Sequence, residues 1–364
     1  MSNVTFIFKG SREEKDKSNI DYPKDFYYGY HNLSIKDFKK KIINLNQNYS
    51  LGIYRLLDKS IIRITNFPFR IIQILKKENI KIIKNSESVV CINETVAFSA
   101  LFLLKFWNNK YKNKTYIFIS MGFMAKIKKS ENLSYLQRYL VKNIFEVYSK
   151  IVFVGKPEYK FAVSKYPEYS KKFVYIPFCV DTKFWKSNNE IKKKYITFIG
   201  SDENRNPDKV LQIAKELPQL DFLMVTNLIN CKTDLKNVKI VNSDFHNKAL
   251  SDSEIRNVYN ESKLIILPLK ETLQPVGQSV ALQSMSMGVP VIINKTSGFW
   301  DDENFTNDKN VVLLDDDTNN DWVETIIKLH TDEKLYNSIS LNAKQLVNKK
   351  FNIELFTDEI VKLL

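Results

Sequence analysis

Short apolar runs recur along the chain, and several of them end in Gly, Pro or Ser. Runs of this kind are typical of strands buried in a parallel sheet. In the first half of the chain they predict strands at 4–8, 88–92, 116–120, 151–155 and 173–177. In the second half they predict strands at 195–200, 221–226, 238–242, 264–267 and 289–293.

Between these runs, apolar residues recur at a spacing of three or four, which predicts helices. Strands that alternate with helices are the pattern of doubly wound α/β domains. The last segment, 319–364, is expected to form two or three further helices. The expected earlier helices span 60–77, 95–107, 134–150, 207–217, 251–260 and 276–287.

The periodic pattern lapses in the polar stretch KSNNEIKKK, which follows Trp185. A chain of 364 residues is long for one domain, so two are expected. We predict Rossmann-like domains at 1–186 and 187–345, and a C-terminal helix at 346–364 that packs on the N-terminal domain. Ligands are then expected at the carboxyl ends of the strands, in a cleft that the two domains face.

Charge divides the chain in the same place. Residues 1–186 carry 34 Lys and Arg against 15 Asp and Glu, whereas residues 187–364 carry 21 against 26. The first half therefore favours an anionic partner, either nucleic acid or an anionic membrane surface. The alternative is that a Lys-rich surface merely keeps the protein in solution.

Cysteine and histidine suggest neither disulfides nor zinc. The three cysteines and three histidines are widely spaced and form no ligand cluster, which favours a reducing, cytoplasmic environment. The N-terminus lacks a secretory pattern. No run approaches the roughly 18 apolar residues that a membrane span needs, and the longest, 96–107, contains Lys105.

The stretch QPVGQSVALQSMSMGVPVI, residues 274–292, differs from the rest of the chain by its small residues and lack of charge. Gly277 would let the backbone approach a ligand closely. The amides of Gln278, Ser279 and Val280 would lie in the first turn of a helix, where they and the helix dipole favour a phosphate. The methionines farther along this helix are expected to pack against the sheet.

This stretch resembles the donor-site segment of retaining GT-B glycosyltransferases, the GT4-like or "glycosyl transferases group 1" family. Three further stretches agree in the same order: FVYIPFCVDTKFW (173–185), YITFIGSDENRN (195–206) and LSDSEIRNVYNESKLIILPLKET (250–272). The similarity is strong over 151–314 and weak over 1–150. It implies two Rossmann-like domains and transfer of a sugar from a nucleotide-diphosphate donor with retained anomeric configuration.

The resemblance also implies roles for individual residues. Arg205 matches the basic residue that neutralises the departing diphosphate, and Lys209, one helical turn later, could share this task. Gly200 and Ser201 lie in the matching glycine-containing loop. The helix amides at 278–280 would hold the diphosphate of a UDP- or GDP-linked sugar, with no metal and no cofactor required.

The sequence departs from the family at a pair of glutamates that usually stand eight residues apart. Gln283 stands where the second Glu would be, and Gln274 or Glu271 lies near the first. Glu271 is the acid of this loop and is favoured as the donor-site carboxylate. A Gln can still bond a ribose hydroxyl, but it adds no charge.

The N-terminal half departs from the family too. One glycine, Gly10, follows the first strand in place of a Gly-Gly loop, and Ser120 or Met121 replaces a His on the acceptor side. A missing base is compatible with retention, because in a front-face mechanism the leaving phosphate itself takes the acceptor proton.

Basic residues interleaved with aromatic ones at 60–77, 107–114 and 126–129 favour peripheral contact with an anionic membrane. Ordinary packing beneath solvated lysines is the alternative. The expected function is synthesis of a bacterial-type surface glycan on a polysaccharide or lipid-linked acceptor, in assembly with other glycan-synthesis proteins. A nucleotide-sugar epimerase and a non-catalytic GT-B partner subunit are the alternatives. Nucleic-acid binding ranks last, because its usual motifs are absent.

Overall fold

The computed structural model describes residues 2–10, 12, 21–45, 52–110, 114–130, 132–188, 191–228, 233–243, 250–315 and 318–364. The chain forms two compact units. The first consists of Met1–Ile20, Tyr27–Pro177 and Phe356–Leu364, and the second consists of Asp21–Phe26 and Phe178–Leu355. Each unit therefore takes a short segment from the far end of the chain.

The first unit is built on a six-stranded sheet in the order β2-β1-β3-β4-β5-β6, with every neighbouring pair parallel. Five of these strands coincide with apolar runs of the sequence. Their residues are largely apolar on both faces, as expected of a sheet that is covered on both sides. The strands are β1 (Asn3–Lys9), β2 (Lys39–Leu45), β3 (Ser88–Ile92), β4 (Thr115–Ser120), β5 (Lys150–Phe153) and β6 (Phe173–Tyr175).

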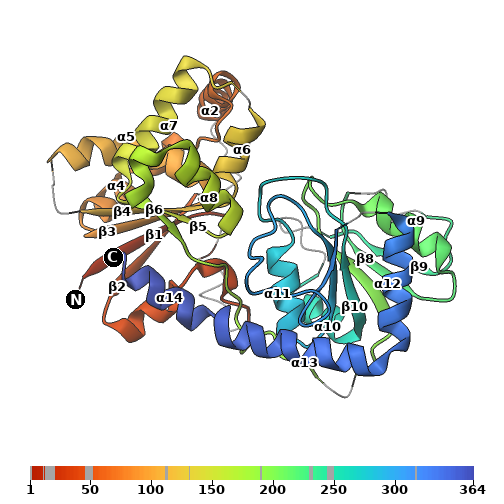
Figure 1. The fold of residues 1–364 in the computed structure, drawn as a ribbon. Coiled ribbons are helices and arrows are strands. Elements are labelled where there is room, and N and C mark those ends of the chain that lie inside the picture. The colour runs from red at the N-terminus through yellow and green to blue at the C-terminus, as the bar shows by residue number, and fades with distance from the viewer. Residues whose placement is uncertain are drawn as a thin grey trace. The chain divides into compact units, whose positions relative to one another are not determined.

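Helices cover both faces of this sheet. Figure 1 shows α5, α7 and α8 over one face and α14 on the other. The helices of the first unit are α2 (Gly52–Thr65), α3 (Ile71–Ile74), α4 (Lys77–Lys84), α5 (Glu94–Lys110), α6 (Phe123–Lys129), α7 (Tyr135–Val147), α8 (Lys156–Lys165) and most of α14 (Ile353–Val361), with 3-10 turns η2 (His31–Lys36) and η3 (Pro167–Lys172).

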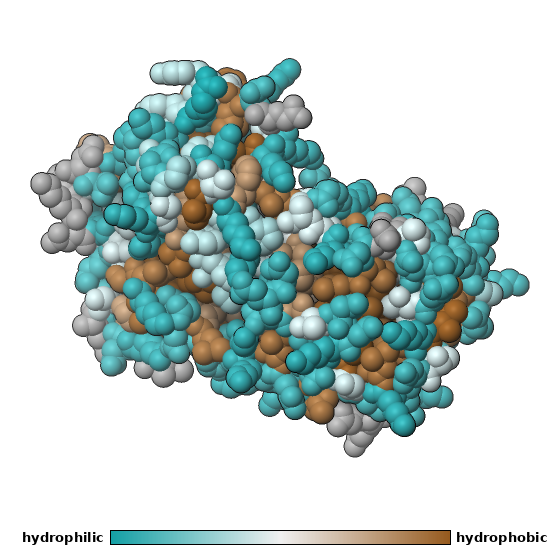
Figure 2. Space-filling model, in the orientation of Figure 1, coloured by the Kyte–Doolittle hydropathy of each residue, from teal (hydrophilic) through white to brown (hydrophobic). Residues whose placement is uncertain are grey.

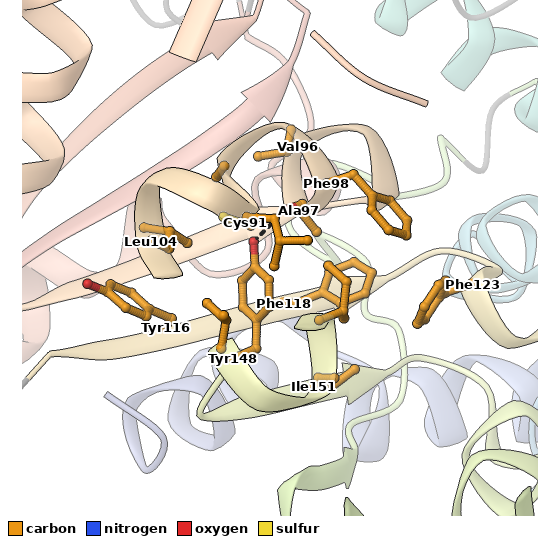
Figure 3. Packing of buried hydrophobic residues seen from close by; sticks show 14 of the residues in the cluster. Cys91, Val96, Ala97, Phe98, Leu104, Tyr116, Phe118, Phe123, Tyr148 and Ile151 are labelled. Atoms are coloured by element: carbon orange, nitrogen blue, oxygen red, sulfur yellow. Dashed lines mark hydrogen bonds between the residues drawn. The ribbon is translucent and has the colours of Figure 1, made fainter. Parts of the chain in front are cut away.

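Apolar side chains from β3, β4, α5 and α7 fill the space beneath α5 and α7. Figure 3 shows this packing, in which Phe118 and Phe98 lie among the buried residues around Cys91. The hydroxyl of Tyr148 donates a hydrogen bond to the carbonyl of Ala97 at 2.9 Å, so its polar atom is satisfied inside the core. Burial raises the pKa of the Cys91 thiol to about 12, so this cysteine acts as a packing residue.

The second unit repeats the architecture with the order β12-β11-β10-β7-β8-β9, again fully parallel. Its strands are β7 (Tyr195–Ile199), β8 (Phe222–Val225), β9 (Val238–Val241), β10 (Ser262–Leu267), β11 (Val291–Asn294) and β12 (Val312–Leu314). Its helices are α9 (Pro207–Glu216), α10 (Asp252–Glu261), α11 (Gln278–Ser286), α12 (Asn319–Thr331) and α13 (Glu333–Lys350), after the short η1 (Asp25–Tyr27) near the N-terminus.

The methionines of α11 pack as the sequence indicated. Met285 and the following Met287 are almost fully buried, and α11 lies against both β11 and α13. Trp322 of α12 is also fully buried and belongs to the core that packs on β7 and β10. The segment 274–292 therefore packs on a buried, apolar base.

The expected fold class is confirmed: two doubly wound, Rossmann-like α/β domains, with a C-terminal helix that returns to the first. The return is anchored by a hydrogen bond of 3.2 Å from the Ser88 hydroxyl to the carbonyl of Leu364. In the described part of the chain, no helix is both long and apolar enough to cross a bilayer. Cys231 and His246 lie outside the described residues.

The single helix expected over 60–77 is wrong. Helix α2 ends at Thr65, Asn66 takes a positive φ of 55°, and α3 begins only at Ile71. Pro68 lies in the gap, and a proline disfavours helical backbone in the residue before it. Strands β2 and β12 were not expected, since three lysines open the first and the second is only three residues long.

Candidate functional site

The second sheet has its switch point between two central strands. From β7 the chain proceeds outward to β8 and β9, and then returns to the other side of β7 to form β10, β11 and β12. The loops that follow β7 and β10 therefore leave the same edge of the sheet in opposite directions. In open α/β sheets this is where ligands bind.

These two loops are joined by backbone hydrogen bonds. The amide of Asn206 donates to the carbonyl of Pro268 at 3.0 Å, and the amide of Lys270 donates to the carbonyl of Asn204 at 2.8 Å. Arg205 pairs with Leu269 between these bonds as an antiparallel bridge. The backbone of Arg205, the predicted basic residue, is thus held by the residues that follow β10.

The Arg205 side chain is buried, with 4% of its surface exposed. Its Nε atom lies 2.7 Å from the carboxylate of Asp202. Within the described part of the chain, its Nη1 atom has no hydrogen-bond partner. A buried guanidinium nitrogen without a partner is costly, and an anionic ligand would supply the missing acceptor.

Two glycines make room for this guanidinium. A Cβ atom at Gly200 would lie 2.6 Å from Arg205 Nε, and one at Gly277 would lie 3.3 Å from Nη1. Gly277 also has a φ of +80°, which side chains rarely adopt. The unpartnered Nη1 atom therefore lies directly beside the N-terminus of α11.

Helix α11 starts without the usual acidic groups. Its N-cap, Gly277, makes no side-chain cap, and its first turn contains no Asp or Glu. Among the described helices of the second unit, α9, α10, α12 and α13 all carry an acid in the first turn. The amides of Gln278, Ser279 and Val280 thus add to the positive potential of Arg205.

The other residues expected at the donor site are distributed around this point. Gln274 accepts a hydrogen bond of 3.4 Å from Asn204, so it lies at the same pair of loops. Lys209 is partly buried in the first turn of α9. The hydroxyl of Ser201 instead donates to the carbonyl of Ser243 at 2.9 Å.

Glu271, the expected donor-site carboxylate, is exposed and bonded to the loop after β11. It accepts hydrogen bonds from both the amide and the hydroxyl of Ser297. In the same loop, a Cβ atom at Gly298 would lie 2.5 Å from the backbone of Leu273. The two loops are therefore in close contact, and Glu271 helps to hold them together.

Gln283 is part of a buried hydrogen-bond network. Its Nε2 atom donates to the carboxylate of Asp25 at 2.8 Å, and its Oε1 atom accepts from the hydroxyl of Tyr259 at 3.0 Å. The indole of Trp185 and the amide of Asp181 donate to the same carboxylate. Burial raises the Asp25 pKa to about 7, against the opposing effect of these donors. Both polar atoms of Gln283 are thus used inside the protein.

This network explains the choice of Gln over Glu at position 283. A glutamate there would place a second carboxyl group against Asp25, and two buried carboxylates in contact repel when both are ionised. Sequence reasoning missed Asp25 and Tyr259, because no local pattern connects position 25 with position 283. The one signal in the sequence was Gln283 itself, a Gln where the resembling family has a Glu.

The carboxyl edge of the first sheet has different chemistry. Glu94, which follows β3, accepts hydrogen bonds from the Met121 amide at 2.7 Å and from the Ser120 hydroxyl at 3.3 Å. Glu158 accepts from the amide of Met124 at 2.7 Å. Burial, and then the charge of Glu94, raises the Glu158 pKa to about 8. Ser120, the last residue of β4, and Met121, the next residue, therefore both lie against a carboxylate.

Gly10 ends β1 next to this edge. It has a φ of +98°, and its amide donates to the carbonyl of Leu45 at 2.9 Å. Lys9, just before it, is partly buried. Burial, and then the charge of Arg70, lowers the Lys9 pKa, while Glu94 raises it. The edge thus combines carboxylates with cations.

Comparison with known proteins agrees with this arrangement. Residues 180–346 match the family described as "Glycosyl transferases group 1". No curated protein sequence matches the chain. Several solved structures resemble the chain over its full length, and three of them are described next.

Sucrose-phosphate synthase of Thermosynechococcus elongatus has a TM-score of 0.72 at 11% identity, covering 100% of this chain and 98% of its own. A glycosyltransferase of Rickettsia africae has a TM-score of 0.66 at 14% identity, covering 100% and 97%. Anabaena HepE, solved with UDP and glucose, has a TM-score of 0.65 at 11% identity, covering 100% and 99%. The resemblance found in the sequence is confirmed: residues 180–346 match the Glycosyl transferases group 1 family, and the chain has the GT-B glycosyltransferase fold.

Proposed function

We propose that this chain is a retaining glycosyltransferase that uses a UDP- or GDP-linked sugar without a metal ion. The observation that carries the proposal is the buried Nη1 atom of Arg205, which has no partner in the described chain and lies beside the N-terminus of α11, where the first turn contains no acid. A diphosphate would satisfy the guanidinium and the helix amides together. Anabaena HepE, of the same fold, was solved with UDP-glucose.

In the proposed reaction, the bond between the sugar C1 atom and the diphosphate oxygen breaks. A bond from C1 to the acceptor oxygen forms on the same face of the sugar, and the acceptor proton passes to the leaving diphosphate. Arg205 and the α11 amides stabilise the negative charge that develops on the leaving group. The residues of this chain thus supply the charge stabilisation that a metal ion supplies in other transferases.

The proposed acceptor is a polysaccharide or lipid-linked glycan, and the proposed location is the cytoplasmic face of a cell membrane. The first half of the chain supports this with a net charge of +19, which an anionic leaflet attracts. Helix α2 also exposes apolar side chains, with Leu56 63% and Ile64 69% accessible. Figure 2 shows hydrophobic surface between hydrophilic side chains in the region of α2.

Calorimetric titration with UDP and GDP, with and without a chelator, tests the donor site. Arg205→Ala should weaken binding of the preferred nucleotide about 30- to 100-fold, or about 2–3 kcal/mol, because a charge-assisted bond is lost. Lys215→Ala, which removes an exposed charge from α9, is the matched control. Equal affinities of the two variants would disprove the proposed diphosphate site.

The anomeric configuration of the product tests retention. Incubation with nucleotide sugars and NMR of the products should show the configuration of the donor preserved in the new linkage. An inverted product would contradict the mechanism, and an isomerised free donor would identify an epimerase. Loss of binding on chelation would contradict metal independence.

A further inference from the structure

A cavity of about 740 Å³ lies within the first unit, between the helices that follow β4 and β5. Its wall comes from the end of α6, the loop before α7, one side of α7, the second half of α8, and η3. A volume of this size is typical of small-molecule sites. No step of the proposed transfer reaction uses it.

The cavity is separate from the carboxyl edge of the sheet. Glu158, in the first turn of α8, contacts that edge through the amide of Met124. Phe161 and Lys165, which line the cavity, lie farther along the same helix. At about 1.5 Å per residue, Lys165 is about 10 Å beyond Glu158 along the helix axis.

Positive charge dominates the wall. Four cations line the cavity, against one carboxylate, Glu168. The Arg138 guanidinium donates to the carbonyl of Leu133 at 2.7 Å, which holds it in place and uses one of its five donors. Lys142 lies 3.7 Å from Glu146, an exposed contact that is weak in water. The four cations are Lys128, Arg138, Lys142 and Lys165.

Aromatic rings form the remainder of the wall. The ring of Phe145 lies 4.7 Å from that of Tyr166 and 5.1 Å from that of Tyr169. The Lys128 ammonium lies 5.9 Å from the ring of Phe161. Cations beside an apolar, aromatic surface match a ligand that joins a phosphate to an apolar group.

Helix α7 also exposes aromatic side chains, one of them on the face that lines the cavity. Tyr135 is 80% exposed and shares a helix face with Arg138 and Lys142, three and seven residues later. On the neighbouring face, Lys105 of α5 lies 5.6 Å from the ring of Tyr139. Helix α5 there exposes Phe106, at 65%. Aromatic side chains of this kind are enriched where proteins meet the lipid headgroups.

We propose that this cavity binds the phosphate headgroup of an anionic lipid while the exposed aromatics of α5 and α7 contact the interface. The inference deepens the membrane contact included in the proposed function and assigns it to α7 rather than to 60–77. The positive wall would take the phosphate, and the aromatic wall the first carbons of the lipid. A soluble phosphate ester has the same anionic group and must be distinguished by experiment.

Flotation of the full-length protein with vesicles tests the site. We expect binding to phosphatidylcholine vesicles that contain phosphatidylglycerol, and at least tenfold weaker binding by Arg138→Gln/Lys142→Gln. The matched control is Lys77→Gln/Lys81→Gln on α4, which removes two exposed charges at the same helical spacing and should change binding less than threefold. Equal losses in the two pairs would show general charge attraction and overturn the proposal.

Two further measurements isolate the ligand and the fold. Tyr135→Ser, at an exposed position, should weaken vesicle binding without lowering the melting temperature. If glycerol 1-phosphate raises the melting temperature of the wild type but not of Arg138→Gln/Lys142→Gln, while both bind vesicles equally, the site takes a soluble ligand and the lipid assignment is wrong. Nucleotide affinity should stay unchanged in these variants, so the donor site is tested separately by Arg205→Ala.

Discussion

The carboxyl edges of the two sheets share a topology but place different groups beside their loop amides. In the first unit, the amides after β4 donate to the carboxylates of Glu94 and Glu158. In the second unit, the first turn of α11 lies beside the guanidinium of Arg205 and contains no acid. Amides already bonded to a carboxylate cannot bind a second anion, whereas amides beside a cation attract one.

One fold thus supports two kinds of site. A doubly wound sheet places loop ends and helix N-termini at its carboxyl edge whatever the sequence. Individual side chains then decide whether those amides remain available. Here one edge has the character of an anion site, and the other of a site for polar, neutral or cationic groups.

An acidic residue in the first turn of α11 should make this edge resemble that of the first unit, where a carboxylate lies beside the amides. We expect Ser279→Asp to weaken nucleotide binding about 100-fold, because its carboxylate would neutralise Arg205 and compete for the amides. Stability should be maintained or rise by about 0.5 kcal/mol, since an acid in the first turn suits the helix dipole. Ser279→Asn is the isosteric control and should bind within threefold of wild type, as measured by calorimetry.

A second change adds a carboxylate deeper in α11. Gln283→Glu would place a carboxyl group against Asp25, and we expect a loss of about 2–4 kcal/mol at pH 8.5. The Asp25 pKa is already raised to about 7, so at pH 6 a proton can be retained between the two groups and the loss should be smaller. Urea unfolding at both pH values measures this. Gln212→Glu, at an exposed site on α9, should have little effect at either.

The smallest expected effect comes from removing an ionisable group from the first edge. The Glu158 pKa is raised from 4.5 to about 8, so folding favours the protonated form, and its stabilising contribution is lost as pH rises from about 4.5 through 8. Gln cannot ionise, and its carbonyl can still accept from Met124. Glu158→Gln should therefore match wild type at pH 5 and exceed it by about 1–2 kcal/mol at pH 9.

Thermal unfolding across this pH range checks the last prediction. Glu78→Gln on α4, an exposed carboxyl, is the control and should follow the wild-type curve at every pH. A Glu158→Gln curve parallel to wild type would mean that Glu158 stays ionised in the folded protein. The ionised carboxylate of Glu158 would then add a negative charge to the first edge at neutral pH.

The sequence was sufficient for the fold class and for the turn and helix at 277–286, whereas the donor-binding role of this turn stays a prediction. Buried parallel strands read as apolar runs, and glycine with a following apolar helix identified the turn before α11. The prediction of one helix over 60–77 is wrong because the apolar spacing continues across Pro68, whereas a helical backbone does not. Strand β2 was hidden because it lies at the sheet edge, where lysines are tolerated.

What the sequence could not show were contacts between distant positions. Asp25 and Gln283 meet across 258 residues, so the reason for Gln in place of Glu was visible only in the folded chain. The cavity beside α7 likewise takes its wall from five separate elements. The sequence around a single helical side chain gives no signal of the distant residues that it contacts in the fold.

The exchange of short end segments between the units has a consequence for synthesis. Asp25 leaves the ribosome early, yet its partners Trp185 and Gln283 follow more than 150 residues later. The first unit in turn needs Phe356–Leu364, which are made only after the whole of the second unit. The first unit therefore cannot reach its final packing before the second unit has been made, and a cut between the two halves would separate each unit from one of its own segments.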